Sequence, residues 1–344
     1  MQNDNERFMR YALREARKGL GRVSPNPAVG AVLVRQGKVI AVGHHRGPGL
    51  PHAEVECLSA APSGSLKSAT LFVTLEPCST TGRTPPCTSA IVQAKVGRVV
   101  VGATDPNPRH SGRGIKELKA AGIEVIHGVL EEECSRLNEA FNKWIVTHRP
   151  FVIAKCGMSL DGRLTRRPNE KRWLTSKGAR LEAMKLRSTV DAILIGANTL
   201  REDNPRLTIR GFGKTRQPWR VVLTRKGNLP RSSHLFADRF ADRTLVYKRQ
   251  TLSQVLDALG AREVTSVLIE GGGDVLGQAF DQRLVDKVQF FLAPILTGGP
   301  TVAVGGNGAG STAEAARISR LTLQQIGPDL VVTGYPQWGG EGVE

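Results

Sequence analysis

Aromatic residues make up only 5% of this chain of 344 residues, and long apolar runs are missing. No stretch approaches the roughly 18 consecutive apolar residues that a transmembrane helix needs. Residues 1–21 lack the apolar segment of a secretory signal peptide, because their apolar side chains recur at helical spacing instead. These absences argue against a membrane protein and predict a soluble protein that works in the cytoplasm.

Cysteine is also scarce, and the five that are present form an odd number, so a framework of disulfides is not expected. Cys57, Cys134 and Cys156 lie in apolar or helical surroundings. We expect these three to be free thiols in a reducing compartment. The other two, Cys78 and Cys87, are the cysteines that fit a metal site.

The net charge of +17 comes without a basic block or tail of the kind that binds nucleic acid. Residues 1–149 contain 20 basic and 13 acidic side chains, and residues 150–344 contain 28 and 18. A nucleic-acid groove would also need aromatic side chains on which bases stack, and these are few. A diffuse excess of this kind suits anionic small substrates, so no nucleic-acid partner is expected.

One histidine and two cysteines have the arrangement of a catalytic zinc site. His52 lies two residues before Glu54, and a proline precedes Cys78, with Cys87 further on. This resembles the H-x-E…P-C-x-x-C pattern of zinc deaminases, except that eight residues separate the two cysteines. Three protein ligands leave the fourth position of a tetrahedral Zn²⁺ open for water. Glu54 could then carry a proton from that water to a leaving amine.

Other interpretations of this pattern remain open. Each cysteine could be a small buried apolar residue and the histidine an ordinary loop residue, although their joint occurrence with Glu54 argues against this. A non-catalytic zinc scaffold would favour four protein ligands and would not need Glu54. An RNA-editing base deaminase with an accessory RNA-binding half would share the His-Ala-Glu run. The long cysteine spacing and the lack of a basic cluster argue against it.

Two polar residues before the zinc pattern are candidates for substrate binding. Asn26 lies between two prolines, which fix the backbone and could present its amide to the edge of a heterocyclic ring. An ordinary turn is the alternative. His45 could contact a substrate phosphate or hydroxyl, or it could be a surface histidine.

Strand and helix patterns alternate along the first half, which predicts a mixed sheet covered by helices on both faces. The predicted strands span residues 29–34, 38–43, 69–75, 96–103 and 123–129. Two helices are predicted to begin after residues 52 and 87, and two more to span residues 114–121 and 131–147. The last helix ends at Arg149-Pro150, which marks a boundary between domains 1–148 and 149–336. Residues 337–344 are predicted to be a disordered tail.

The second half has its own strand and helix pattern. Strands are predicted at 151–156, 192–196, 220–224, 244–247 and 264–270, helices at 176–188 and 275–280, and a loop over 198–210. Three glycines between Glu270 and Asp274 join a strand to a helix, where backbone amides could approach a phosphate. A tight turn would explain them equally well. The dinucleotide fingerprint G-x-G-x-x-G fails here because residue 276 is leucine.

Three motifs of the first half resemble the deaminase half of the bifunctional riboflavin-biosynthesis deaminase/reductase family. They are Pro25-Asn26-Pro27-x-Val29-Gly30, Pro51-His52-Ala53-Glu54-Val55 and Leu75-Glu76-Pro77-Cys78-Ser79-x-x-Gly82-Arg83-Thr84-Pro85-Pro86-Cys87. The resemblance implies a cytidine-deaminase-like α/β/α sandwich with zinc on His52, Cys78 and Cys87 and with Glu54 as the proton shuttle. It also implies substrate contacts from Asn26, His45 and Arg83. The sequence departs from the family at Thr80, where the family usually has His.

The second half resembles the reductase half of the same enzymes, an α/β domain like that of dihydrofolate reductase. The matching residues are Lys155, Ser159-Leu160-Asp161-Gly162-Arg163, Trp173-x-Thr175-Ser176, Leu186-Arg187, Gly196-Ala197-x-Thr199, Asp203-Asn204-Pro205-x-Leu207-Thr208-x-Arg210 and Glu270-Gly271-Gly272. A departure precedes Trp173, where Asn169-Glu170-Lys171-Arg172 replaces the usual Gly-Glu-Ser-Gln. The resemblance therefore implies an α/β protein of two domains.

The resemblance also implies roles for residues of the second half. Lys155 and Asp203 would lie at the reduction site. The substrate would be bound by Lys171, Arg187, Leu207, Arg210 and Glu270, with Arg187 and Arg210 as a phosphate clamp. NADPH would be bound by Gly157, Trp173, Thr199, Asp203, Gly272, Gly273 and Asp274.

Two consecutive reactions follow from the resemblance. The first is zinc-dependent hydrolysis of the 2-amino group of 2,5-diamino-6-(5-phosphoribosylamino)pyrimidin-4(3H)-one. The second is NADPH-dependent reduction of the ribosyl group of the product to ribityl. The expected partner is this small phosphorylated pyrimidine, without membrane or nucleic acid, and a homo-oligomer is expected.

Overall fold

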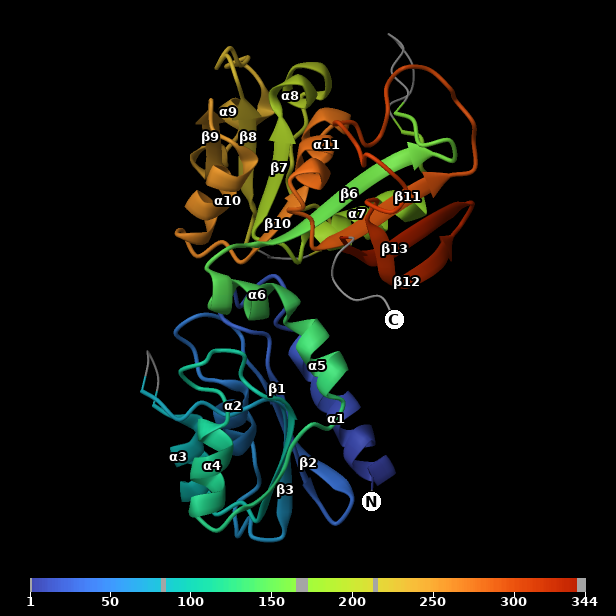
Figure 1. Cartoon of the computed structure of the whole chain (residues 1–344). Coiled ribbons are helices and arrows are strands. Elements are labelled where there is room, and N and C mark those ends of the chain that lie inside the picture. Colours follow the sequence, from blue (N-terminus) through green and yellow to red (C-terminus); the bar gives the residue numbers. More distant parts are fainter. Residues whose placement is uncertain (1, 82–84, 165–172, 213–215, 339–344) are drawn as a thin grey trace. The chain divides into compact units, whose positions relative to one another are not determined.

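The chain divides into two compact units, Met1–His148 and Arg149–Glu344 (Figure 1). The computed structural model describes residues 2–81, 85–164, 173–212 and 216–338. Two residues expected to bind substrate, Arg83 and Lys171, lie outside these ranges, as does most of the expected tail. In the described part of the chain, no helix is both long and apolar enough to cross a membrane.

The first unit is built on a five-stranded sheet in the order β2-β1-β3-β4-β5. The strands are β1 (Gly30–Arg35), β2 (Lys38–His44), β3 (Ala69–Leu75), β4 (Arg98–Ala103) and β5 (Glu124–Ile126). β1 is antiparallel to β2 and β3, whereas β3, β4 and β5 are parallel, so the sheet is mixed.

Helices cover both faces of this sheet, as Figure 1 shows. One face carries α1 (Gln2–Arg17) and α5 (Glu131–Leu137), and the other carries α2 (Ala53–Ser59), α3 (Cys87–Gln93) and α4 (Arg113–Ala120). Because both faces are covered, β1, β3 and β4 are buried almost throughout and are correspondingly apolar. The predicted α/β/α sandwich is confirmed.

The predicted helix over 131–147 is wrong in one respect, because it is two helices that meet at Asn138. α5 ends at Leu137, and α6 (Glu139–Thr147) begins after a residue with φ −112° and ψ 22°. The buried Asn138 side chain accepts a hydrogen bond from Ala28 N (2.8 Å) and donates one to Ala28 O (3.0 Å). These contacts bind the helix junction to the segment that carries Asn26.

The second unit contains an eight-stranded sheet in the order β12-β13-β11-β6-β10-β7-β8-β9. The strands are β6 (Phe151–Ser159), β7 (Ala192–Gly196), β8 (Trp219–Thr224), β9 (Thr244–Lys248), β10 (Ser266–Ile269), β11 (Lys287–Ala293), β12 (Arg317–Ile326) and β13 (Asp329–Gln337). Six neighbouring strands are parallel to one another, namely β11, β6, β10, β7, β8 and β9. β13 is antiparallel to both of its neighbours, β11 and β12.

Helices pack on both faces of this sheet too. The helices are α7 (Lys177–Arg187), α8 (Ala197–Asp203), α9 (His234–Ala237), α10 (Leu252–Gly260) and α11 (Gly273–Asp281), with a 3₁₀ turn at Ala241–Arg243. α10 and α11 belong to the core cluster that contains Val288 of β11. α7 packs through Ala179 against Phe291, which points to the opposite face of β11.

The structure differs from the sequence prediction in two parts of this unit. The predicted loop over 198–210 begins as helix α8, and its remainder runs as an irregular segment from Asn204 to Arg210. Sequence patterning also failed to predict α10 and strands β11 to β13. β12 is exposed along nearly its whole length, so it lacks the alternation of buried and exposed residues that would reveal a strand.

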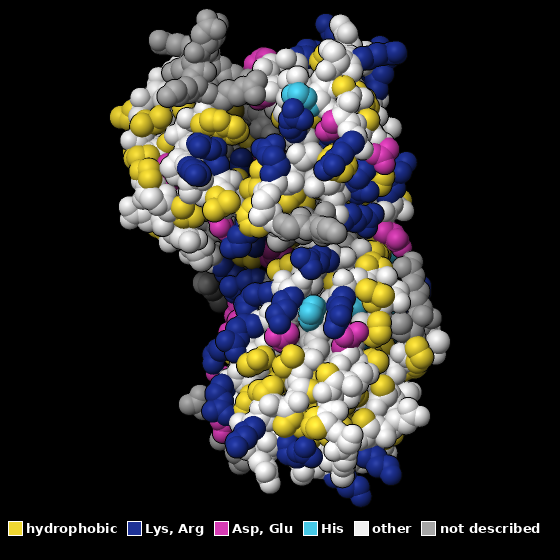
Figure 2. Space-filling view, turned by 180° about the vertical axis from the view of Figure 1, so that it is seen from behind, with side chains coloured by type: hydrophobic (Ala, Val, Ile, Leu, Met, Phe, Trp, Pro, Cys, Tyr) yellow, Lys and Arg dark blue, Asp and Glu magenta, His cyan; other side chains and the backbone are white. Residues whose placement is uncertain are grey.

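The distribution of charged side chains and the state of three cysteines agree with the expectations from the sequence. On the face drawn in Figure 2, Lys and Arg side chains occur on both units, in line with the spread of charge along the chain. Cys57, Cys134 and Cys156 are buried free cysteines, as expected.

Candidate active sites

Three side chains of the first unit form a compact group of possible metal ligands. His52 is the residue before α2, Cys78 follows β3, and Cys87 is the first residue of α3. The ligand atoms all lie within 4.8 Å of one another, and His52 Nδ1 is 3.5 Å from Cys78 Sγ and 3.3 Å from Cys87 Sγ. Ligand atoms around a tetrahedral Zn²⁺ with ordinary bond lengths are about 3.5 Å apart, so the group fits this ion.

A hydrogen bond between the two thiols favours the thiolate form of one of them, Cys78. The backbone N–H of Cys87 donates to Cys78 Sγ at 3.4 Å. The hydrogen bond between the two thiols, helped by His52, lowers the pKa of Cys78 to about 4, and it raises the pKa of Cys87. A thiolate is therefore stabilised at Cys78, and the thiolate is the form of cysteine that binds metal.

Glu76 holds the segment that carries Cys78. Its buried carboxylate accepts hydrogen bonds from the backbone N–H groups of Asp105 (3.1 Å), Gly112 (2.9 Å) and Ile115 (3.2 Å). It thus joins the end of β3 to the start of α4. Sequence reasoning missed this residue, although a carboxylate at the end of an apolar strand is a signal that it needs buried hydrogen-bond donors.

Glu54 lies in the first turn of α2, 3% exposed, next to the Cys87 thiol. Burial raises the pKa of its carboxyl to about 7. A carboxyl group that can gain and lose a proton near neutral pH, beside a possible metal site, has the properties of a general acid and base.

Asn26 and His45 form a hydrogen-bonded pair close to the metal ligands. His45 Nδ1 lies 3.1 Å from Pro51 O, and its Nε2 lies 3.0 Å from Asn26 Nδ2. Because a carbonyl oxygen only accepts, Nδ1 carries the proton and Nε2 accepts from the Asn26 amide. His45 is 3% exposed, and its ring is 5.3 Å from that of His52. In the described part of the chain, Asn26 Oδ1 and its second side-chain N–H have no hydrogen-bond partner, so both are available to a ligand.

Thr80, where the sequence departs from the family pattern, contacts a histidine that sequence reasoning did not single out. Thr80 Oγ1 is 3.3 Å from Nδ1 of His110, which lies beyond the turn that follows β4. The third expected substrate contact of this unit, Arg83, lies outside the described residues.

The second unit contains a buried cluster of one carboxylate and two cations. Glu270 follows β10, and Arg187 at the end of α7 donates to it through Nε (2.6 Å) and Nη2 (2.7 Å). Lys155 of β6 places its Nζ 3.6 Å from Glu270 Oε2. Burial alone would raise the pKa of Glu270, but Arg187 and then Lys155 outweigh it and lower this pKa to about 2. The bidentate pair leaves Nη1 as the part of Arg187 that could bind a substrate.

Glycines and a threonine lie together where β7 and β10 end. Thr199 Oγ1 accepts a hydrogen bond from Gly272 N at 3.3 Å, just before α11. A Cβ added at Gly273 would lie 2.4 Å from Val302 O, so only glycine allows this close approach. Asp274 is exposed in the first turn of α11. This junction suits the backbone binding of a phosphate.

The other expected cofactor and substrate residues are more dispersed. Trp173 is 63% exposed, and the Arg180 guanidinium lies 5.2 Å from its ring centre. Gly157 lies on β6 and faces Thr175. Asp203 ends α8. Leu207 is buried in the segment that follows, and Arg210 is exposed, with its backbone N–H directed at Met184 Sδ (3.4 Å).

The depressed pKa of Glu270 leads to a prediction for acid stability. Because its folded pKa of about 2 lies below the ordinary value of 4.5, ionised Glu270 stabilises the second unit fully above pH 4.5. This contribution is lost as the pH falls through 2. Glu270→Gln should unfold more easily at neutral pH, by about 3–5 kcal/mol, and should lose less stability on acidification than the unaltered protein. Thermal unfolding at neutral and acidic pH measures both effects.

Asp257→Asn is the matched control for this prediction. Asp257 also pairs with an arginine, Arg149 (2.6 Å), but this pair is exposed, so its removal should change stability by only about 0–1 kcal/mol. An equal acid dependence in Glu270→Gln and the unaltered protein would show that Glu270 does not stabilise the fold in this way.

Two different protein families match this chain, one in each of the two units. Residues 2–103 match the family model of the cytidine and deoxycytidylate deaminase zinc-binding region, and residues 150–332 match that of the RibD C-terminal domain. The riboflavin biosynthesis protein RibD of Synechocystis is 41% identical, covering 96% of both chains. The Escherichia coli protein of that name is 34% identical, covering 95% of this chain and 98% of its own.

Solved structures show the same similarity over both units. RibD of Acinetobacter baumannii superimposes with a TM-score of 0.89 at 33% identity, covering 98% of this chain and 100% of that one. A diaminohydroxyphosphoribosylaminopyrimidine deaminase/5-amino-6-(5-phosphoribosylamino)uracil reductase from Thermotoga maritima gives 0.87 at 35% identity, covering 98% and 99%.

Fold, sites and relatives together define a two-domain enzyme in which a zinc-binding deaminase unit precedes a reductase unit. The chain belongs to the RibD family of riboflavin biosynthesis proteins. It is a bifunctional deaminase and reductase, and the alternative of a tRNA deaminase with an RNA-binding half is not favoured, because the relatives match along both units.

Proposed function

We propose that the protein deaminates a diaminohydroxyphosphoribosylaminopyrimidine and then reduces the ribosyl group of the product, with NADPH as the reductant. The observation that carries the proposal is the group His52, Cys78 and Cys87 beside the buried Glu54, in a chain that also has the Lys155–Glu270–Arg187 cluster. The Thermotoga maritima relative, which is named for these two reactions, supports the choice of substrates.

In the deaminase site, His52, Cys78 and Cys87 would hold the zinc ion. Bound there, zinc would make a water molecule acidic near neutral pH. Glu54 would take a proton from this water and later deliver it to the departing amine, a transfer that its burial next to the ligands favours.

Asn26 would read the edge of the pyrimidine with its Oδ1 and its remaining N–H. His45 accepts the other amide proton, so it fixes which way the Asn26 amide faces. We therefore assign His45 to positioning Asn26 rather than to a contact with a phosphate or hydroxyl, because both ring nitrogens already have partners. Arg83 remains a proposed contact of the phosphoribosyl group.

In the reductase site, Lys155 would give a proton to the ribose ring oxygen as the bond from C1′ to that oxygen breaks. The cofactor, when bound, would supply the hydride to C1′. Glu270 holds both Lys155 and Arg187, so it would orient the proton donor and the guanidinium together. Lys171, Leu207 and Arg210 would complete substrate binding, with Arg187 and Arg210 on the phosphate.

The residues proposed to hold the cofactor come from β6, from the segment before α7, from α8 and from the start of α11. They are Gly157, Trp173, Thr199, Asp203, Gly272, Gly273 and Asp274. The preference for NADPH over NADH is part of this proposal.

The proposed setting is the cytoplasm, where Cys57, Cys134 and Cys156 would stay reduced. A homo-oligomer is also proposed, because the edge strand β12 exposes Leu321 and Leu323.

One set of incubations tests the function. The protein is supplied with the diaminopyrimidine substrate, with and without NADPH, and both expected products are measured. Deaminated product should form without NADPH, and ribityl product should form only when NADPH is added. A zinc chelator should stop the first product. Failure of the zinc-loaded protein to release ammonia from this substrate would contradict the proposal.

A further inference from the structure

The segment from Asn204 to Arg210 follows α8 directly, as the first part of the connection to β8, and contains a strained residue. Leu207 has φ +50°, a backbone conformation that residues other than glycine rarely adopt, yet its side chain is only 2% exposed. Residues held in such conformations cluster at functional sites, where the surrounding structure enforces them. This segment carries Leu207 and Arg210, and both belong to the proposed substrate site.

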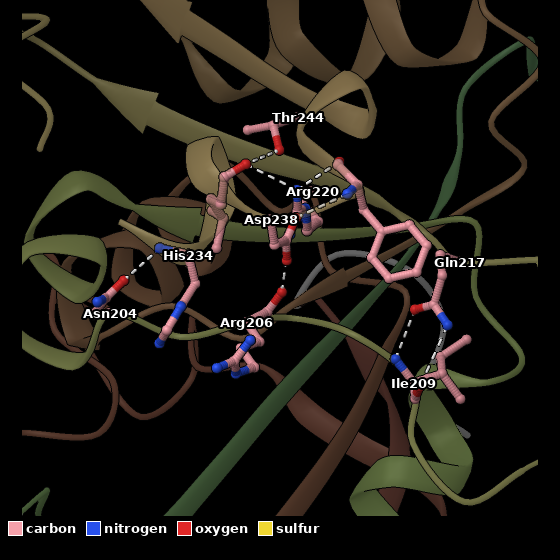
Figure 3. A network of polar contacts seen from close by, with 10 residues as sticks. Asn204, Arg206, Ile209, Gln217, Arg220, His234, Asp238 and Thr244 are labelled. Carbon is pink, nitrogen blue, oxygen red and sulfur yellow. Dashed lines mark hydrogen bonds and ion pairs between the residues drawn. The ribbon is translucent and has the colours of Figure 1, made fainter. Parts of the chain in front are cut away.

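A buried arginine holds the chain on one side of Leu207. Arg220 lies on β8 with its side chain 1% exposed, and its Nη1 donates to Arg206 O (3.3 Å) and to Asp238 Oδ2 (2.8 Å). Its Nη2 donates to Leu235 O (2.8 Å) and Phe240 O (2.5 Å), as drawn in Figure 3. Burial of a charged group is unfavourable unless it is paired, so this guanidinium needs Asp238 and the three carbonyl groups that it contacts. Its Nε is buried and has no hydrogen-bond partner among the described residues.

An amide side chain holds the chain on the other side of Leu207. Gln217 Oε1 accepts from Ile209 N (2.8 Å), and Gln217 Nε2 donates to Ile209 O (3.3 Å). Both contacts are visible in Figure 3. The start of the segment is held as well, because Asn204 Oδ1 accepts from His234 N (2.8 Å) at the beginning of α9.

We propose that Arg220, Gln217 and Asn204 are positioning residues of the reductase site, which fix the segment from Asn204 to Arg210 in the shape that binds the phosphorylated pyrimidine. The inference rests on the proposed reductase function. Arg220 and Gln217 bind the main chain of this segment of seven residues on the two sides of its strained position, at Arg206 and at Ile209. Asn204, the first residue of the segment, accepts through its side chain from His234 N and so holds the start of the segment to α9. None of the three needs to touch the substrate, so they act through Leu207 and Arg210.

Gln217 offers the cleanest test, because Arg220 also holds Leu235 and Phe240 and its replacement could unfold the unit. Gln217→Leu should raise the KM for the deaminated pyrimidine by about tenfold, while kcat and the KM for NADPH change by less than about twofold. Gln217→Glu keeps the acceptor for Ile209 N, so its KM should fall between those of Gln217→Leu and the unaltered protein. Initial rates of NADPH oxidation give these constants.

Thr244→Val is the matched control. Thr244 Oγ1 donates to Leu235 O (2.8 Å) in the same network, but among the described residues its side chain has no hydrogen bond to the segment. Its KM for the pyrimidine should stay unchanged, and deamination by the first unit should be normal in every variant. A KM in Gln217→Leu equal to that in Thr244→Val would overturn the positioning role. Absence of reduction by the unaltered protein would instead overturn the proposed reductase function.

Discussion

Glu54→Gln is expected to lower the rate of deamination by a factor on the order of 10²–10⁴, with zinc content and fold retained. Glutamine has nearly the same shape as glutamate, so it should fit the buried position in α2. Its amide cannot accept a proton from water and return it to the leaving amine. Ammonia release measures the rate, and metal analysis measures the zinc.

Glu56→Gln is the matched control for this prediction. Glu56 lies two residues further along α2, pairs with Arg46 (2.8 Å) and is not one of the three possible metal ligands. Deamination by this variant should be close to normal. If Glu54→Gln also deaminates at a near-normal rate, Glu54 has no part in proton transfer.

Lys155→Met should lower the rate of ribosyl reduction by a factor on the order of 10²–10⁴ and leave deamination unchanged. Methionine is close in length to the lysine side chain, so the stem of residue 155 should still pack on β6. The lost ammonium group is the proposed proton donor, and it lies 3.6 Å from the buried Glu270. Glu270 would keep its bidentate partner Arg187, so the unit should remain folded. Accumulation of deaminated intermediate in the presence of NADPH is the expected readout.

Lys287→Met serves as the control for Lys155. Lys287 lies on the neighbouring strand β11, and its Nζ is 5.2 Å from the ring centre of Tyr335. Its replacement should leave reduction nearly unchanged. Equal reduction rates in the two variants would remove Lys155 from the chemistry.

Local patterns were sufficient to predict the elements that carry the zinc group. Strand β3 was predicted over the residues that it occupies, because seven apolar or β-branched residues end at a glutamate and a proline. The helix after His52 was expected from the helical spacing of Ala53, Glu56, Cys57 and Ala60, and the structure has His52 directly before α2. The spacing of His52, Cys78 and Cys87 indicated a shared metal, and their ligand atoms lie together.

Contacts between distant residues could not be predicted in this way. Asn138 interrupts a helix pattern that continues on both sides of it, and its partner Ala28 is 110 residues away. Arg187 and Glu270 are 83 residues apart, so their ion pair has no local signal. Arg220 lies in an apolar strand pattern where a charged residue is expected to face water, yet its partners bury it completely.

The central claim is that two independent active sites lie in the two units, and one measurement tests it most directly. Zinc-loaded Glu54→Gln protein is supplied with the deaminated intermediate, and NADPH oxidation is followed by absorbance. We expect oxidation at the rate of the unaltered protein, because Lys155, Arg187 and Glu270 all lie in the second unit. Loss of NADPH oxidation together with deamination, in a protein that remains folded, would show that the two active sites are not independent.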